Sequence, residues 1–155
     1  IRELPELFDH YFASAMWKVG ELWHRNEIDI FEEKICSTTI QASIDILANR
    51  VPSVIASGRS AIIAGFPHTV DTIAGKMLAA SLRSVGVSTF DLGCNVPVPS
   101  IAKAAVTHSA SLICINHTHV VDIDEVIHHH RLLKDSVADG TQIVIGGGGL
   151  SASMR

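Results

Sequence analysis

Four short runs of β-branched and other apolar residues alternate with three stretches of helical periodicity, and this alternation constrains the fold of the chain most. The apolar runs cover residues 61–65, 87–91, 111–116 and 141–145, and the helical stretches cover residues 71–85, 98–109 and 122–137. Because two strands joined through a helix form a right-handed unit with parallel strands, the pattern predicts a parallel sheet. We therefore expect an α/β domain with a flavodoxin-like, doubly wound parallel sheet.

The N-terminal segment predicts a separate helical unit. Residues 4–49 place apolar side chains at three-and-four spacing, and Gly20 is expected to divide them into two helices. The second helix should begin near Asp29, where Glu32 completes a capping box, and end at Asn49. Two helices bury little surface by themselves, so they must pack on another element.

The expected domain organisation has three parts. Residues 1–50 form the helical unit, residues 51–60 a linker rich in Pro, Ser and Gly, and residues 61–155 the α/β domain. The chain begins within a helical pattern and stops soon after a glycine run. We therefore expect a domain excised from a larger protein, incomplete at the C-terminal end of its α/β part.

The composition argues against several classes of function. With 47% hydrophobic and 18% charged residues and a net charge of −4, the chain has no basic patch for a nucleic-acid backbone. Any link to DNA would then pass through a partner protein. No apolar run reaches the ~20 residues that a membrane span requires, and the three cysteines form no Cys-x-x-Cys pair. We expect a cytoplasmic protein without a structural zinc site.

The turn Pro67–Ile73 follows the first predicted strand and precedes a helix. Open α/β sheets bind their ligands at this carboxyl edge. The search for a functional site therefore centres on this edge. The sequence has no Gly-x-Ser-x-Gly elbow and no Gly-x-Gly-x-x-Gly loop, so we expect neither catalysis nor nucleotide binding.

Three segments together resemble the cobalamin-binding domain family, as found in MerR-type cobalamin photoreceptor repressors and corrinoid carrier proteins. They are Gly20–Trp23 followed by Glu33, the strand, turn and helix over 61–86, and the turn Asp91–Pro97. The resemblance implies that residues 1–50 are part of a four-helix cap over a corrin ring. It also implies that Trp23 and Glu33 lie above that ring, although Trp23 could equally be core.

The sequence departs from this family at the cobalt ligands. The axial histidine of the Asp-x-His-x-x-Gly turn falls on Asp71, and the second histidine of the photoreceptors falls on Lys34, whose ammonium has no lone pair to donate. Asn116 and His117 replace the serine that meets the nucleotide tail. This pattern resembles the group of sensors containing heme instead of cobalamin, which are attached to flavin-based blue-light photoreceptors that antagonise a transcriptional repressor.

Histidines at the carboxyl edge are candidates for the heme iron. His68 lies three residues before the vacant ligand position and is the candidate axial ligand, the alternative being a loop residue bonded to backbone. His117 and His119 should share one face after the third strand, as ligands, propionate contacts or ordinary turn residues. Asp71 either contacts the ligand or caps the helix that follows it.

Two other segments have simpler interpretations. The glycines Gly146 and Gly147 either admit a cofactor tail or form a flexible loop, with no helix expected after them. The triplet His128–His130 lies in a predicted helix, where successive residues point about 100° apart and cannot converge on one metal. We interpret the triplet as a solvated helix face and Trp17 as plain packing.

These observations lead to a non-enzymatic, tetrapyrrole-binding regulatory module. We expect heme in preference to cobalamin, with the occupied domain contacting a transcriptional repressor or another regulatory protein. A ligand-free interaction domain with a degenerate cobalamin fold is one alternative, and a corrinoid-binding carrier is the other.

Overall fold

The computed structural model of the protein describes residues 3–50, 55–118 and 122–153. Its centre is a parallel sheet in the order β2-β1-β3-β4, which confirms the predicted flavodoxin-like architecture. The strands are β1 (Ser60–Ala64), β2 (Ser88–Asp91), β3 (Leu112–Asn116) and β4 (Gln142–Gly146). The order places β1 and β3 side by side although two helices and β2 separate them in sequence. No helix in the described part of the chain is long and apolar enough to span a bilayer.

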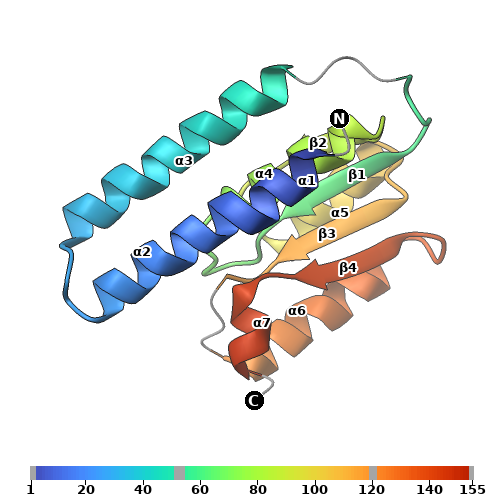
Figure 1. Cartoon of the computed structure of the whole chain (residues 1–155). Coiled ribbons are helices and arrows are strands. Elements are labelled where there is room, and N and C mark those ends of the chain that lie inside the picture. Colours follow the sequence, from blue (N-terminus) through green and yellow to red (C-terminus); the bar gives the residue numbers. More distant parts are fainter. Residues whose placement is uncertain (1–2, 51–54, 119–121, 154–155) are drawn as a thin grey trace.

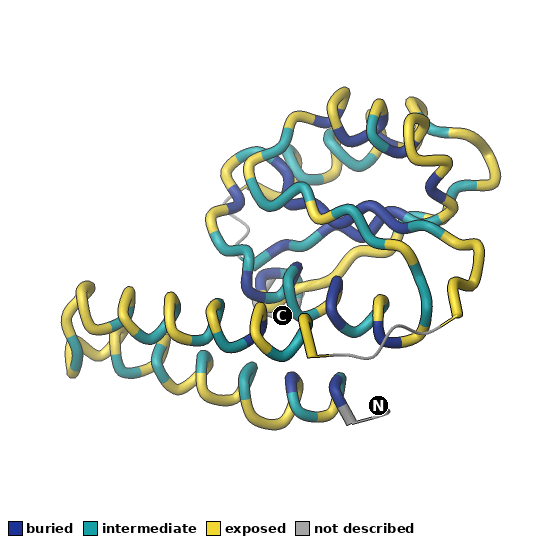
Figure 2. The backbone as a smooth tube through the Cα atoms, turned by 90° about the horizontal axis from the view of Figure 1, so that it is seen from above, coloured by how far each residue is buried: buried dark blue, intermediate teal, exposed yellow. Residues whose placement is uncertain are grey.

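Helices cover both faces of the sheet (Figures 1 and 2). They are α4 (Ile73–Ser84), α5 (Val98–Thr107) and α6 (Ile123–Ser136), and the short helix α7 (Gly148–Ser153) follows the end of β4. Side chains of β1 alternate between the two layers, because Ile62 packs with α5 and α6 whereas Ile63 packs with α4. The predicted strand and helix boundaries in this domain lie within about two residues of the observed ones.

The N-terminal helices form a long hairpin. Its first arm runs without a break through α1 (Glu3–Leu7), the π-helical turn η1 (Phe8–Ala13) and α2 (Ser14–His24), and its second arm is α3 (Ile30–Arg50). The expected break at Gly20 is wrong, because one glycine costs a helix only about 1 kcal/mol. The predicted start of the second helix is confirmed: the Glu32 carboxylate accepts the Asp29 N–H at 2.8 Å.

This hairpin packs on the sheet domain through the parts of its two arms that lie away from the hairpin turn. Leu4, Phe8 and Ile44 pack with Ile73 and Ala80 of α4 in one buried cluster. Beyond the cluster, Lys76 Nζ lies 2.8 Å from both carboxylate oxygens of Asp45. The turn of the hairpin projects past the carboxyl ends of the strands (Figure 1). α2 therefore lies over the carboxyl edge of the sheet, where a ligand is expected.

Candidate functional site

The loop between β1 and α4 forms the floor of the candidate site. Gly65 N–H donates to Gly93 O at 2.8 Å, and His68 N–H donates to Asn95 Oδ1 at 3.2 Å, which ties this loop to the turn after β2. At its end, Asp71 Oδ1 accepts the Ile73 N–H at 2.8 Å. The Asp71 side chain thus satisfies one of the free amides at the start of α4, as a helix cap does.

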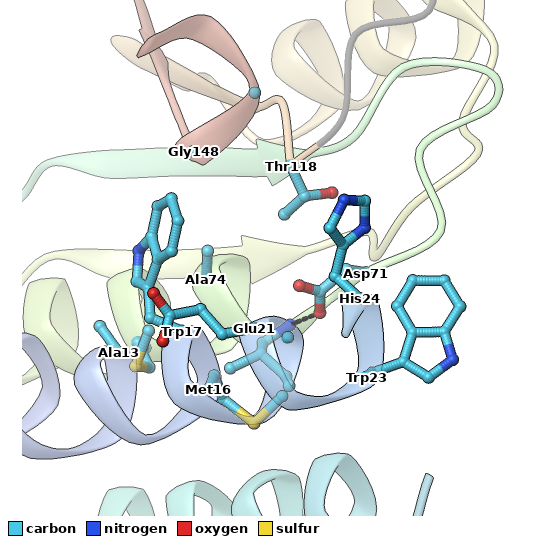
Figure 3. Close-up of a pocket in the computed structure, with 14 residues that line it drawn as sticks. Ala13, Met16, Trp17, Glu21, Trp23, His24, Asp71, Ala74, Thr118 and Gly148 are labelled. Atoms are coloured by element: carbon cyan, nitrogen blue, oxygen red, sulfur yellow. Dashed lines mark hydrogen bonds between the residues drawn. The ribbon is translucent and has the colours of Figure 1, made fainter. Parts of the chain in front are cut away.

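A cleft of about 770 Å³ separates this floor from α2. Its α2 wall is a stripe at three-and-four spacing, the pattern that puts side chains on one face of a helix. Figure 3 shows this stripe on one side of the cleft, with Ala74, Thr118 and Gly148 of the sheet domain on the other side. The lining residues are Ala13, Met16, Trp17, Gly20, Glu21, Trp23 and His24 from the hairpin, and Asp71, Ile73, Ala74, Met77, Thr118, Gly148 and Gly149 from the sheet domain.

The cleft combines aromatic walls with a few polar groups. The Trp17 ring reaches toward the β4 edge, since a Cβ at Gly148 would lie 3.9 Å from its Cζ2 atom. The His24 imidazole points from α2 toward the loop that carries Thr118, near Asp71 (Figure 3). Thr118 Oγ1 is buried and has no hydrogen-bond partner among the residues that the structure describes. Such an atom is costly to leave unpaired, which favours a bound polar group beside it.

Two of the predicted site residues, Trp23 and Asp71, line this cleft. Glu33 does not line it: its carboxylate accepts Ser37 Oγ–H at 2.6 Å and lies 2.9 Å from Lys34 Nζ. Burial raises the pKa of Glu33, but these two partners outweigh burial and leave the pKa below its usual value. The Glu33 carboxylate is therefore occupied on α3 instead of extending over the cleft.

The predicted histidine ligands lie elsewhere. The His68 side chain is 74% exposed, with Nε2 3.6 Å from Glu125 Oε1. His117 is buried, its ring packed edge-on against Phe66 and its Nε2 atom 3.0 Å from Nε2 of His130. Neither residue lines the cleft, so their assignment as ligand contacts stays a prediction that this geometry does not favour. His119 lies outside the described residues.

Asn116, Gly146 and Gly147 border a second, smaller pocket of about 150 Å³ between α4 and strands β3 and β4. Asn116 Nδ2–H also donates to Asp71 O at 3.4 Å. The absence of a helix after the glycines is a wrong prediction, because α7 begins at Gly148. These three predicted residues therefore belong to a pocket adjoining the cleft and not to the cleft itself.

The histidine triplet is not the uniformly solvated face that the sequence predicts. His129 and His130 both pack against the Phe66 ring, with centroid separations of 5.4 and 4.7 Å, and of the three only His128 is exposed. Burial, followed by the neighbouring imidazoles of His117 and His129, lowers the pKa of His130 to about 4. Among the described residues, no group of three or more His, Cys, Asp or Glu side chains is arranged to hold a metal ion.

Sequence reasoning missed Trp17 and His24, which the structure brings into the cleft. The signal was present, because residues 13, 16, 17, 20, 23 and 24 repeat at helical spacing. Interrupting the helix at Gly20 hid that stripe. No similar signal places His130 beside His117, since that contact depends on how α6 packs on the sheet.

Comparisons with known proteins agree with this architecture. A family model described as "B12 binding domain" matches residues 59–155, and a second one with the same description matches residues 2–48. Dimethylamine corrinoid protein 1 of Methanosarcina acetivorans is 21% identical over 145 residues, which cover 92% of this chain and 68% of that protein.

Two solved structures share the fold. The monomethylamine corrinoid protein of Methanosarcina barkeri superimposes with a TM-score of 0.74 at 17% identity, covering 97% of this chain and 79% of that one. A cobalamin-binding protein from Desulfitobacterium hafniense gives a TM-score of 0.52 at 21% identity, over 85% of this chain, which spans only 63% of that structure. None of these relatives is described as a heme protein or a photoreceptor.

Proposed function

Because the chain belongs to the B12 binding domain family, we propose that the cleft between α2 and the sheet edge binds the corrin ring of a cobalamin or related corrinoid. The observation that carries the proposal is the position of this cleft. It lies at the carboxyl edge where β1 and β3 are neighbours, the place where open α/β sheets bind ligands. In this proposal the chain is a corrinoid-binding carrier module and not itself an enzyme.

The residues of the cleft fit a flat tetrapyrrole. Its volume of about 770 Å³ falls within the range of ligand pockets. Trp17 and Trp23 offer broad apolar surfaces to a macrocycle, and the unpaired Thr118 Oγ1 offers a hydrogen bond to its polar rim. When bound, a corrinoid supplies a cobalt centre that can accept and release a methyl group. The chain's own residues would orient the ring and exclude water from it.

Asp71 gives the site its main peculiarity. Its carboxylate already caps α4 through the Ile73 amide, so it is not free in the way an axial imidazole would be. Ligand binding from this side would thus rest on packing and hydrogen bonds. The absence of an imidazole at position 71 also motivates a second candidate function. This candidate is a heme-binding regulatory module that contacts a transcriptional repressor. The relatives favour the corrinoid, and direct titration separates the two.

The test compares aquocobalamin and haemin in parallel equilibrium dialysis against the chain. We expect aquocobalamin to bind at one equivalent, with haemin weaker. Retention of haemin alone would favour the regulatory module, and retention of neither would leave a ligand-free interaction domain.

Gly20→Phe should block the cleft without harming the fold. Gly20 lines the cleft, and a Cβ placed there meets no atom within 4 Å. Replacing a helical glycine also favours the helix by up to about 1 kcal/mol. We expect aquocobalamin affinity to fall at least about tenfold, equivalent to ~1.4 kcal/mol, with an unchanged or higher melting temperature.

The matched control is Ala15→Phe, on the same helix at an exposed residue that does not line the cleft. This variant should bind aquocobalamin as the unmodified chain does. Equal affinity for the two variants would place the corrinoid outside the cleft.

A further inference from the structure

The smaller pocket between α4 and strands β3 and β4 is a feature that the proposed function does not use. It adjoins the cleft, because Ala74, labelled in Figure 3, lines both. Cobalamin carries, besides its corrin ring, a nucleotide made of a bicyclic base, a ribose and a phosphate. The smaller pocket has a volume of about 150 Å³, which is half of the ~300 Å³ at which ligand pockets begin. The whole nucleotide therefore does not fit into it.

The lining of the smaller pocket also lacks partners for a nucleotide. Of the residues that line it, none is Lys or Arg, and only Cys114 and Asn116 have a polar group in the side chain. Burial raises the pKa of the Cys114 thiol, so this group stays neutral. Asn116 Nδ2–H already donates to Asp71 O at 3.4 Å. A phosphate buried here would lose its hydration and find no opposite charge to replace it.

The walls of the smaller pocket are tied together by close contacts. On the helix side, a Cβ added at Gly75 of α4 would lie 3.4 Å from Ile63 Cγ2, so α4 packs directly on β1. On the sheet side, Asn116 pairs with Gly146 in the ladder of β3 and β4, and His117 N–H donates to Gly146 O at 2.7 Å. Enlarging the pocket would therefore break sheet hydrogen bonds or separate α4 from β1.

We propose that the site recognises the corrin ring alone and leaves the nucleotide outside, in solvent. This inference rests on the proposed function, because it requires a corrinoid in the cleft. Asn116 lines the smaller pocket and Asp71 lines the cleft, so the hydrogen bond between them closes the boundary between the two. The ligand class is then corrinoids in general, with or without a nucleotide, and the nucleotide adds nothing to the affinity.

The first test compares aquocobalamin with aquocobinamide, which has the same ring and no nucleotide, by equilibrium dialysis against the chain. We expect aquocobinamide to bind no more than about threefold more weakly than aquocobalamin. A cobalamin that carries a bulky dye on the 5′-hydroxyl of its ribose should bind as well as aquocobalamin does, because that group stays in solvent. A larger advantage for aquocobalamin would overturn the proposal, as would exclusion of the dye conjugate.

The second test uses the matched variants Val144→Trp and Gln142→Trp. Both residues are exposed and share one face of the edge strand β4, but only Val144 lines the smaller pocket. An indole at position 144 would fill that pocket, and aromatic residues are well tolerated in strands. Both variants should bind aquocobalamin as the unmodified chain does.

The result that would contradict this expectation is selective. If Val144→Trp loses aquocobalamin but retains aquocobinamide, while Gln142→Trp binds both, the nucleotide enters the smaller pocket and the proposal is wrong. That result leaves corrinoid binding in the cleft intact. If the unmodified chain binds neither aquocobalamin nor aquocobinamide, the proposed function itself is wrong and this inference falls with it.

Discussion

Gly147→Ala should lower the free energy of unfolding by about 3 kcal/mol. Gly147 has a φ of +117°, a conformation that residues with a Cβ rarely adopt. An added Cβ would overlap the carbonyl oxygen of His117 and lie 2.7 Å from Asn116 Oδ1. The same His117 carbonyl accepts the Gly149 N–H at 2.9 Å, so the clash cannot be relieved without moving α7. Urea denaturation followed by circular dichroism measures the loss.

Gly146 supplies a matched control for this prediction. A Cβ added at Gly146 meets no atom within 4 Å, and its φ is not positive. Gly146→Ala should therefore change the free energy of unfolding by less than about 1 kcal/mol. Because Gly148 and Thr118 line the cleft, Gly147→Ala should also weaken aquocobalamin binding. Similar free energies of unfolding for the two variants would show that Gly147 does not lie as close to the His117 carbonyl as described.

Acidification should destabilise the domain through the His117–His130 pair. Burial, followed by repulsion from His129, lowers the pKa of His117, and burial with the adjacent rings lowers the pKa of His130 to about 4. The unfolded chain, with an ordinary histidine pKa near 6.5, then binds protons that the folded chain does not. Stability should be fully present above about pH 6.5 and fall as the pH drops toward 4. The lowered pKa of His130 alone should reduce the free energy of unfolding by about 2 kcal/mol at pH 5.

The measurement is the free energy of unfolding in urea at pH 7.5 and pH 5. His130→Phe should reduce the difference between the two values, because it removes the imidazole with the largest lowering and keeps the contact with Phe66. His128→Ala, at the exposed neighbouring position, should leave the difference unchanged. An equal pH dependence in all three proteins would show that the buried pair does not control acid stability.

The alternation of apolar and helical stretches was sufficient to predict the sheet domain. Each strand coincides with a short run of β-branched and other apolar residues bounded by Gly, Pro or Ser, and such signals are local. The capping box at Asp29 and Glu32 was predictable for the same reason. The break at Gly20 was wrong because a single glycine only weakens a helix, and α2 continues through it from Ser14 to His24.

The site was predictable in position but only partly in its residues. The carboxyl edge follows from topology, and Asp71 is brought there by the turn that contains it. Glu33 instead contacts Ser37 and Lys34. His117 instead contacts His130. Such competition between partners depends on tertiary contacts. Trp17 and His24, by contrast, follow from helical spacing once the first arm is treated as continuous.

The most direct measurement of corrinoid binding in the cleft is tryptophan fluorescence during titration with aquocobalamin. The chain has two tryptophans, Trp17 and Trp23, and both line the cleft. A corrin ring between α2 and the sheet edge would contact or approach both indoles. We expect saturable quenching that is complete at one equivalent and is lost in Gly20→Phe. Emission that stays constant, after correction for absorption by the corrinoid, would contradict the account.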